Sequence, residues 1–326
     1  MSALSRFADW MRAYEHVDRK HRLPAGLKLQ YHSRSSRPSQ QLAEFVVDDL
    51  LEACPVLAEQ AARGDVAYAI DREHRWPNGK KKKLDLALGI PSTRAAPSVG
   101  TIRRLGRDDG NFDRLLIGIE EKAVMTEHGK SQPRVFSELN DSHVIVHQGD
   151  RWAIAGGLTV VNVAPTFISP LLQDPQRPVR ITSHSQPDVT AAMVRHLRGL
   201  NIRDRVDDVG FDAYCTFVMD VDNQGRVELH TAPPAPQIGD SDHYATFVSR
   251  LASAYVQRFA NLEDLPDAAG LSVEEALATF GRDNPGTLGA TADWLLAGHL
   301  AGGVELAAIL SALDPADAVG EDDSEQ

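Results

Sequence analysis

The sequence is poor in cysteine and aromatic residues, and it has no long uninterrupted apolar run. Its two cysteines, Cys54 and Cys215, form no CxxC pair, which argues against a disulfide scaffold or a thiolate zinc site. The most apolar stretch, 288–313, contains Asp293, His299 and Glu305, so no segment is predicted to span a bilayer. The N-terminus lacks the apolar region of a signal peptide. We therefore expect a cytoplasmic protein with no membrane partner.

Several nucleotide-binding and hydrolase motifs are also missing. The Ala-Gly-Gly at 155–157 is not followed by Gly-Lys-Ser/Thr, so the chain has no P-loop and ATP hydrolysis is not expected. There is no Gly-x-Ser-x-Gly motif of a serine hydrolase. No His-Glu-x-x-His motif accompanies His128, His143 and His147, which favours structural or surface histidines over zinc ligands.

The net charge of −12 is distributed unevenly along the chain. Residues 262–326 contain 14 acidic residues and one basic residue, which leaves 33 basic and 32 acidic residues in 1–261. Residues 19–37 contain six Lys or Arg and no acid, and we expect there a loop that is solvated or contacts nucleic acid. The acidic C-terminal part is interpreted as a solvating appendage. Docking of a protein partner and covering of the basic face are its alternative roles.

Hydrophobic spacing predicts an α/β fold, with a central mixed sheet flanked by helices and an acidic α-helical C-terminal segment. The expected divisions are an N-terminal helix with a basic loop at 1–38, a main domain at 39–261, an acidic helical segment at 262–313 and a disordered tail at 314–326. Expected helices cover 39–62, 133–147, 189–200 (capped by Asp188) and 243–260, and expected strands or hairpins cover 66–90, 112–124, 152–164 and 211–231.

The first chemically informative pattern is Glu120-Glu121-Lys122, which ends an apolar strand. Alternate side chains of a strand share a face, so Glu120 and Lys122 are expected on one side and Glu121 on the other. A carboxylate is a ligand that Mg²⁺ prefers, and a neighbouring lysine can orient or deprotonate an attacking water. The side chain of Glu121 is interpreted as a surface residue or as the partner of a buried group, while its backbone carbonyl can still bind a metal.

The second pattern is Asp85, which alternates with Leu84, Leu86 and Leu88. The leucines are expected to face a core, so Asp85 should point away from it. If this strand pairs with the strand of Glu120, the two carboxylates can converge on one metal ion.

This order of helix, hairpin with Asp85, strand with Glu120-x-Lys122 and helix resembles the PD-(D/E)XK nuclease superfamily, to which restriction endonucleases belong. The resemblance covers about residues 40–165. It implies that Asp85 and Glu120 bind Mg²⁺, with Mn²⁺ as a substitute, and that Lys122 assists the water. Further metal ligands are expected in Glu121 and in Glu44, with Asp48 next.

The sequence departs from the family pattern at two points. Leu84 rather than proline precedes Asp85, and 35 positions separate Asp85 from Glu120. Asp71 and Asp113 therefore remain alternative metal ligands. Thr126 and His128 are further candidates for contacting DNA or a metal-bound water.

Basic residues around these motifs are the predicted DNA contacts, because phosphate contacts supply most non-specific affinity. They are Lys81, Lys82, Lys83, Arg103, Arg104, Lys130 and Arg134. The resemblance implies a metal-dependent endonuclease that cuts double-stranded DNA, in restriction or anti-phage defence. A homodimer is plausible because two sites are needed to cut both strands. The alternatives are a repair, recombination or RNA nuclease of the same fold, and an inactive module that binds DNA or protein.

Overall fold

The computed structural model describes residues 1–17, 23–93, 102–106, 108–266 and 268. Contacts divide the chain into one unit of residues 1–206 and 210–270 and a second of residues 207–209 and 271–326. Every helix and strand of the described residues belongs to the first unit. The helices and the tail that the sequence predicts after 270 lie outside the described residues.

A seven-stranded mixed sheet forms the centre of this unit. Its spatial order is β3-β1-β2-β4-β5-β8-β9. The strands β1, β2 and β4 are antiparallel neighbours, β4, β5 and β8 run parallel, and β9 returns antiparallel to β8. The strands are β1 (Ala67–Arg75), β2 (Lys81–Pro91), β3 (Arg103–Arg104), β4 (Phe112–Val124), β5 (Ile154–Asn162), β8 (Ala213–Val221) and β9 (Val227–His230). The predicted α/β class and both predicted hairpins are confirmed.

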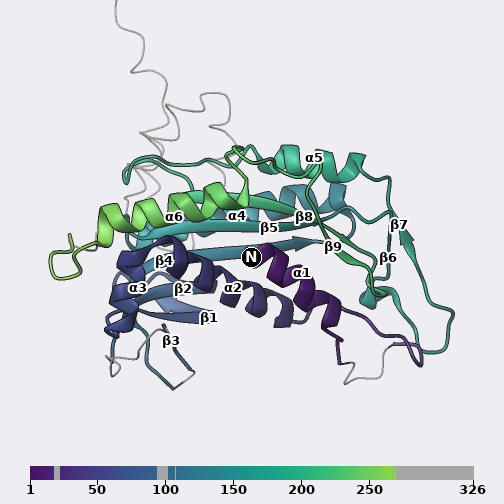
Figure 1. The fold of residues 1–326 in the computed structure, drawn as a ribbon, viewed down its shortest axis with the longest axis horizontal. Helices are drawn as coiled ribbons and strands as arrows, with labels where there is room; N and C mark the ends of the chain where they lie inside the picture. Colours follow the sequence, from purple (N-terminus) through teal and green to yellow (C-terminus); the bar gives the residue numbers. More distant parts are fainter. Residues whose placement is uncertain (18–22, 94–101, 107, 267, 269–326) are drawn as a thin grey trace, which may run out of the picture. The chain divides into compact units, whose positions relative to one another are not determined.

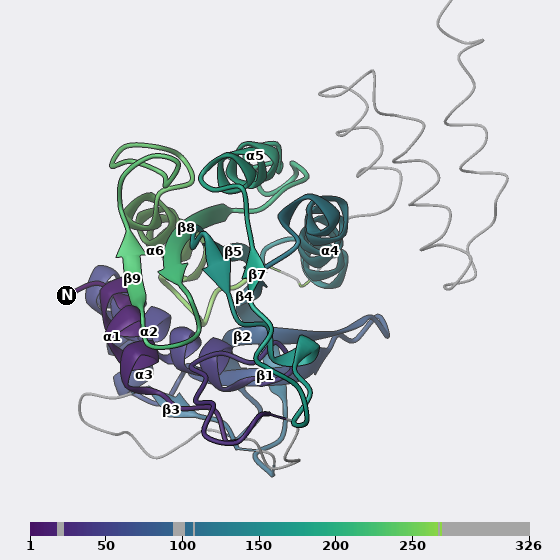
Figure 2. The same ribbon diagram turned by 90° about the vertical axis from the view of Figure 1, so that its right-hand side faces the viewer.

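Helices cover both faces of the sheet, as Figures 1 and 2 show. One face carries α1 (Ala3–Ala13), α2 (Arg37–Ala53), α3 (Pro55–Ala62) and α6 (Tyr244–Phe259), and the other carries α4 (His128–Gly149) and α5 (Asp188–Leu197). The helices α4 and α5 connect the parallel strands β4, β5 and β8, since parallel neighbours need a long crossover. All nine residues of β5 are buried because helices pack on both sides of it.

Three local predictions differ from the structure. The helix expected over 39–62 is two helices, α2 and α3, separated at Cys54 because Pro55 lacks the N–H that a continuous helix requires. Asp188 lies in the first turn of α5, but no side chain caps that helix, so the predicted cap is wrong. Between the strands expected at 66–90 and 112–124, where no strand was predicted, the structure has the short strand β3. Among the described residues no helix is both long and apolar enough to cross a membrane.

An additional hairpin, which the sequence did not indicate, connects β5 to α5. It consists of β6 (Thr166–Phe167), a 3₁₀ turn at Pro170–Leu172 and β7 (Thr182–Ser183). Phe167 is buried at its base. We call residues 165–184 the arm.

Candidate active site

The pairing of β2 with β4 brings Asp85 next to the Glu120-x-Lys122 motif. The last paired residues of this ladder are Leu86 and Ile119, and Asp85 and Glu120 follow them directly on the two strands. The Asp85 Oδ2 accepts a hydrogen bond of 2.7 Å from the backbone N–H of Glu121. The structure therefore brings together the three residues that the sequence selected as catalytic.

At Asp85, the side chains of β2 stop alternating regularly between the two sides of the sheet. Leu84 packs in the core on the α4 side, whereas Leu86 packs in the core on the α2 side. Alternate residues of a regular strand share a face, so the prediction that these leucines line one core is wrong. The neighbouring position on β1 is Asp71, whose φ of 56° is in the left-handed region that non-glycine residues rarely adopt. Asp85 thus lies opposite Asp71 and directly beyond the last paired residues of β2 and β4.

Glu120 is buried on the α4 side of the sheet, with 6% of its surface exposed. Its Oε1 lies 2.6 Å from Lys122 Nζ, and its Oε2 lies 3.2 Å from Lys82 Nζ. The Ser142 hydroxyl donates a further hydrogen bond of 3.3 Å to Oε2. Two ammonium groups and a hydroxyl thus compensate for the burial of one carboxylate.

Lys122 connects the strand to α4, because its Nζ also lies 3.2 Å from Glu138 Oε2. Burial lowers the pKa of Lys122, but the charge and hydrogen bond of Glu120 outweigh this effect and raise it above its usual value. Lys122 is therefore a firmly charged ammonium group at neutral pH. Glu138 in turn binds Arg134 at 2.9 Å. Sequence reasoning missed Glu138 and Ser142, although Arg134, Glu138 and Ser142 recur every four residues on one face of α4.

The acids of this site carry more negative charge than their hydrogen bonds balance. Burial and repulsion by Glu120 raise the pKa of Asp85 to about 6, although the Glu121 N–H and Lys122 oppose the shift. Both carboxylate oxygens of Glu121 are buried without a hydrogen-bond partner. Burial, followed by the charges of Asp85 and Glu120, raises the pKa of Glu121 well above its usual value. We call Asp85, Glu120, Glu121 and Lys122 the acid cluster.

Glu121 lies on the opposite face from Glu120, as predicted for a regular strand. Its neighbour on β5 is Leu158, which packs in the core on the α2 side. The side chain therefore points into the protein interior. It neither lies on the surface nor satisfies a buried polar group, which were the two interpretations from the sequence.

The other acids considered as metal ligands lie in different surroundings. Glu44 contacts Arg104, and among the described residues no hydrogen bond or ion pair joins it to the acid cluster. Asp48 binds Arg6 at 2.7 Å. Asp71 binds Lys83 at 2.6 Å and lies near enough to Asp85 to raise its pKa. Asp113 is exposed at the opposite end of β4.

Most predicted DNA contacts are exposed basic residues that pair with an acid. Lys81, Lys83, Lys130 and Arg134 have side chains at least 58% exposed, paired with Glu73, Asp71, Glu127 and Glu138. Arg103 pairs with Asp109 and Arg104 with Glu44.

Lys82 differs from its two neighbours. Only 14% of its side chain is exposed, and it binds Glu120. Thr126 is half-buried. His128 is buried, with its Nε2 2.8 Å from the carbonyl oxygen of Asn162, so it connects α4 to the end of β5.

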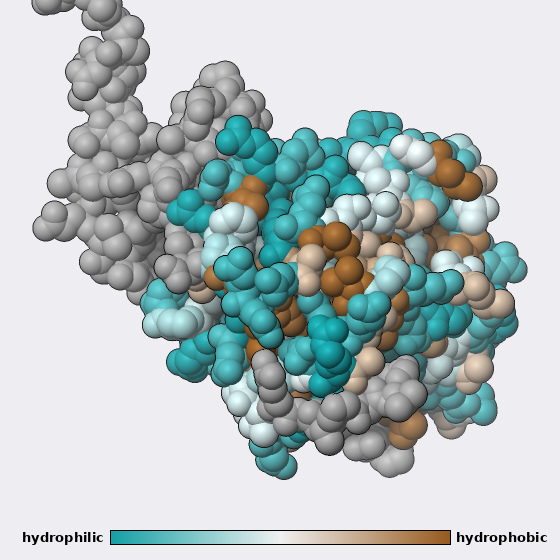
Figure 3. Space-filling model, turned by 60° about the vertical axis from the view of Figure 1, so that its left-hand side comes forward, coloured by the Kyte–Doolittle hydropathy of each residue, from teal (hydrophilic) through white to brown (hydrophobic). Residues whose placement is uncertain are grey.

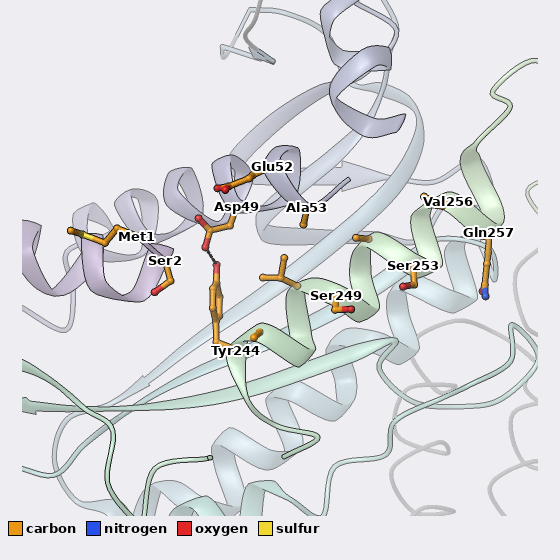
Figure 4. A pocket seen from close by; sticks show the side chains of 13 residues that line it. Met1, Ser2, Asp49, Glu52, Ala53, Tyr244, Ser249, Ser253, Val256 and Gln257 are labelled. Carbon is orange, nitrogen blue, oxygen red and sulfur yellow. Dashed lines mark hydrogen bonds between the residues drawn. The ribbon is translucent and has the colours of Figure 1, made fainter. Parts of the chain in front are cut away.

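A groove of about 830 Å³ lies on the other side of the sheet, between the start of α1, the end of α2 and α6 (Figure 4). Its ionisable residues are Asp49, Glu52 and Tyr244, and the Tyr244 hydroxyl donates to Asp49 at 3.0 Å. Figure 3, which brings forward the side of α3 and the end of α6, shows apolar residues gathered among hydrophilic ones. The groove is separate from the acid cluster because Glu120 faces α4.

The chain matches no model of a known protein family, no curated protein and no solved structure. Among the described residues, no three His, Cys, Asp or Glu side chains are arranged as a ready metal site. The resemblance to PD-(D/E)XK nucleases accordingly stays a prediction. Interpretation of the acid cluster depends on its own geometry and charge.

Replacing Glu121 by leucine is expected to raise the free energy of unfolding by about 1–3 kcal/mol near pH 8, because two buried oxygens without partners are removed. The gain should shrink toward about pH 5, since a carboxyl with a raised folded-state pKa destabilises the fold only as pH rises above its unfolded value. Urea unfolding at both pH values measures this difference. A variant that is less stable than the wild type at pH 8 would contradict it, and Glu121→Gln isolates the effect of the charge.

Proposed function

We propose that this protein is a metal-dependent nuclease whose active site consists of Asp85, Glu120 and Lys122. The observation that carries the proposal is the half-buried Asp85 carboxylate beside the buried Glu120–Lys122 ion pair, at the point where the pairing of β2 with β4 ends. The raised pKa of Asp85 adds support, because strongly shifted carboxyl groups concentrate at functional sites.

The topology supports the same proposal. Apart from the short elements α3 and β3, the chain runs from α2 through the antiparallel strands β1, β2 and β4 to α4 and the parallel strand β5. Asp85 lies on the second of these strands and Glu120-x-Lys122 on the third. This is the order on which the resemblance to PD-(D/E)XK nucleases was based.

The residues of the acid cluster fit a divalent cation. Mg²⁺ needs only one or two protein carboxylates and retains several waters, so a set of three carboxylates is not required. Asp85 and Glu120 would hold it, with the Glu121 carbonyl as a further oxygen ligand. The raised pKa of Asp85, which Glu120 repels, marks a place where positive charge is in deficit. When bound, the cation supplies a water of lowered pKa and positive charge beside the phosphate.

The protein's own groups position and charge the site. Glu120 and Glu138 hold the Lys122 ammonium group from two sides, which fixes where it can meet a phosphate oxygen or an attacking water. Lys82 supplies a second positive charge on Glu120. Ser142 orients the same carboxylate from α4. Each of these groups comes from a regular strand or helix, which holds a site more rigidly than a loop does.

Double-stranded DNA is the proposed substrate. Exposed Lys81 and Lys83 on the β1–β2 hairpin, with Lys130 and Arg134 on the first turns of α4, flank the acid cluster and can contact phosphates. A setting in restriction or anti-phage defence, and a homodimer that cuts both strands, follow from the resemblance. An inactive DNA-binding module is the second candidate. It is favoured by the full engagement of Glu120 with Lys122, Lys82 and Ser142.

Purified protein is expected to nick or cut supercoiled plasmid when Mg²⁺ or Mn²⁺ is added, and Asp85→Ala is expected to lose this activity. Asp113→Ala is the matched control, because Asp113 is exposed at the far end of β4. Equal cleavage by all three proteins would refute the assignment. DNA binding without cleavage would favour the inactive module. Discrete fragments favour a restriction enzyme, whereas preference for branched, single-stranded or RNA substrates favours the other nuclease types.

A further inference from the structure

The arm exposes an unusual number of apolar side chains. Nine large hydrophobic residues of the described chain are exposed, and four of them lie within residues 171–181. Concentrated exposed apolar surface marks interaction sites on otherwise soluble proteins. The four are Leu171, Leu172, Val179 and Ile181, at 51%, 44%, 38% and 55% exposed.

Hydrogen bonds within the arm fix the backbone that carries these exposed side chains. Its two strands pair Thr166 with Ser183 and Phe167 with Thr182. Between them, the Gln173 side chain donates to the carbonyl oxygens of Ser169 at 2.8 Å and of Arg180 at 2.9 Å, and it accepts from Arg180 N at 3.0 Å. These bonds cross the loop and fix its shape, so the leucines are presented by an ordered hairpin.

The arm leaves the sheet close to the acid cluster. Lys122 is paired with Thr159 of β5, which ends three residues later at Asn162, about 10 Å along the strand. Asn162 Nδ2 donates to Met125 O at 3.2 Å, which ties the end of β5 to the chain just after β4. A duplex that lies on the acid cluster would therefore meet the arm within one helical turn, which is about 34 Å.

A basic segment lies against the base of the arm (Figures 1 and 2). Asn223 Nδ2 donates to Tyr31 O at 2.9 Å and to Ile168 O at 2.8 Å, and the Tyr31 and Phe167 rings meet edge to face at 6.3 Å. Residues 23–37 are the described part of the basic stretch singled out in the sequence, which the catalytic site does not use. Together with the arm they contain five basic residues and one acid, namely Lys28, Arg34, Arg37, Arg177, Arg180 and Asp174.

We propose that the arm and residues 23–37 bind the duplex DNA that flanks the scissile phosphate, with Leu171 and Leu172 against the minor groove. Apolar side chains beside arginines are the combination with which minor-groove proteins wedge between base steps. Arg177 and Arg180 contact the phosphates on either side and set the position of the duplex. The proposal rests on the proposed function for the identity of the ligand.

Fluorescence anisotropy of a labelled duplex, with the full chain and a chelator present, tests the arm without cleavage. The double variant Leu171→Ser/Leu172→Ser is expected to bind about tenfold more weakly, because buried apolar contact is lost. The variant Arg177→Gln/Arg180→Gln should reduce the slope of log K against log salt by about 2, as expected for two lost phosphate contacts. Ile238→Ser, at a 92% exposed position of another loop, and Arg63→Gln, after α3, are the matched controls and should bind as the wild type does.

The possible outcomes distinguish a failure of the inference about the arm from a failure of the nuclease proposal. Arm variants that bind like the controls overturn the inference, even if the wild type cuts plasmid. Weakened binding by the arm variants supports it, even if the wild type shows no metal-dependent cleavage and the nuclease proposal fails. If light scattering shows a wild-type dimer that the arm mutations convert to a monomer with unchanged DNA affinity, the arm is a protein interface and the inference is wrong.

Discussion

Replacing Lys122 by methionine is expected to lower the rate of metal-dependent DNA cleavage by about 10²- to 10⁴-fold, which is the usual contribution of a positioned proton-transfer group. Methionine retains most of the side-chain length but removes the ammonium group that Glu120 and Glu138 hold from two sides. Lys82 and Ser142 remain on Glu120, so its buried carboxylate keeps two partners. The loss should therefore appear in the cleavage step, measured in single-turnover reactions at saturating protein, with DNA affinity in chelator nearly unchanged.

Lys80→Met is the matched control for this experiment. Lys80 is an exposed lysine directly before β2, and it is not one of the predicted phosphate contacts. Cleavage by this variant should remain within a few-fold of the wild type. Similar losses in both variants, or a loss at Lys122 that comes only from weaker binding, would show that Lys122 acts as one of several phosphate contacts. Thermal unfolding of both variants verifies that they fold.

The local periodicity of the sequence predicted the strands of the site, but it did not predict to which side of the sheet the residues around Asp85 point. The alternation of Ile117 and Ile119, which pack on the α2 side, is enough to place Glu120 and Lys122 together on the other side, since a regular strand repeats every two residues. Leu115 belongs to the same alternating series but packs on the α4 side, beyond a register shift in the pairing of β2 with β4. Leu84 and Leu86 break this rule next to Asp71, which adopts a left-handed conformation on the neighbouring strand. Nothing in the sequence around Asp85 indicates that irregularity, because it arises from pairing with another segment.

The sequence predicted which charged residues belong to the site, but it did not predict which of them form ion pairs with one another. Four consecutive lysines precede Asp85, and composition alone treats them as one exposed run. The structure separates them, because Lys82 is directed to Glu120 while Lys81 and Lys83 remain exposed. Burial of a single lysine depends on which helix covers the strand. That arrangement depends on the tertiary structure. The only indication of it in the sequence was the four-residue spacing of Arg134, Glu138 and Ser142 on α4.

A second buried charge network, remote from the proposed chemistry, surrounds Asp212 at the start of β8. Its Oδ1 accepts from Arg203 Nε at 2.9 Å and from Arg258 at 2.5 Å, and its Oδ2 accepts from Arg203 Nη2 at 3.0 Å and from Ala155 N at 2.7 Å. His147 Nε2 lies 3.5 Å from the same carboxylate. The carboxylate is 2% exposed, and the arginines are 0% and 7% exposed. Burial raises the pKa of Asp212, but the arginines and His147 outweigh it and hold the pKa far below its usual value.

Asp212→Asn is expected to lower the free energy of unfolding by about 3–5 kcal/mol, because removal of one partner leaves buried arginines facing a neutral amide. The amide also turns one acceptor into a donor that opposes N–H groups. Urea unfolding near neutral pH measures the loss, and Asp9→Asn, in the exposed pair with Arg12, should cost less than about 1 kcal/mol. A similar, small cost for both variants would show that the network contributes little to stability.

The same network should make the wild type sensitive to mild acid. Burial, followed by the charge of Arg203, lowers the pKa of His147 to about 4, although Asp212 opposes the shift. The unfolded chain binds a proton at the ordinary histidine value of about 6.5, so stability should fall as pH decreases from about 6.5 toward 4. His143, also buried and shifted downward, adds to this slope. Because His147 neighbours Asp212, His147→Gln should flatten the dependence measured by urea unfolding, whereas an unchanged slope would exclude this histidine as its source.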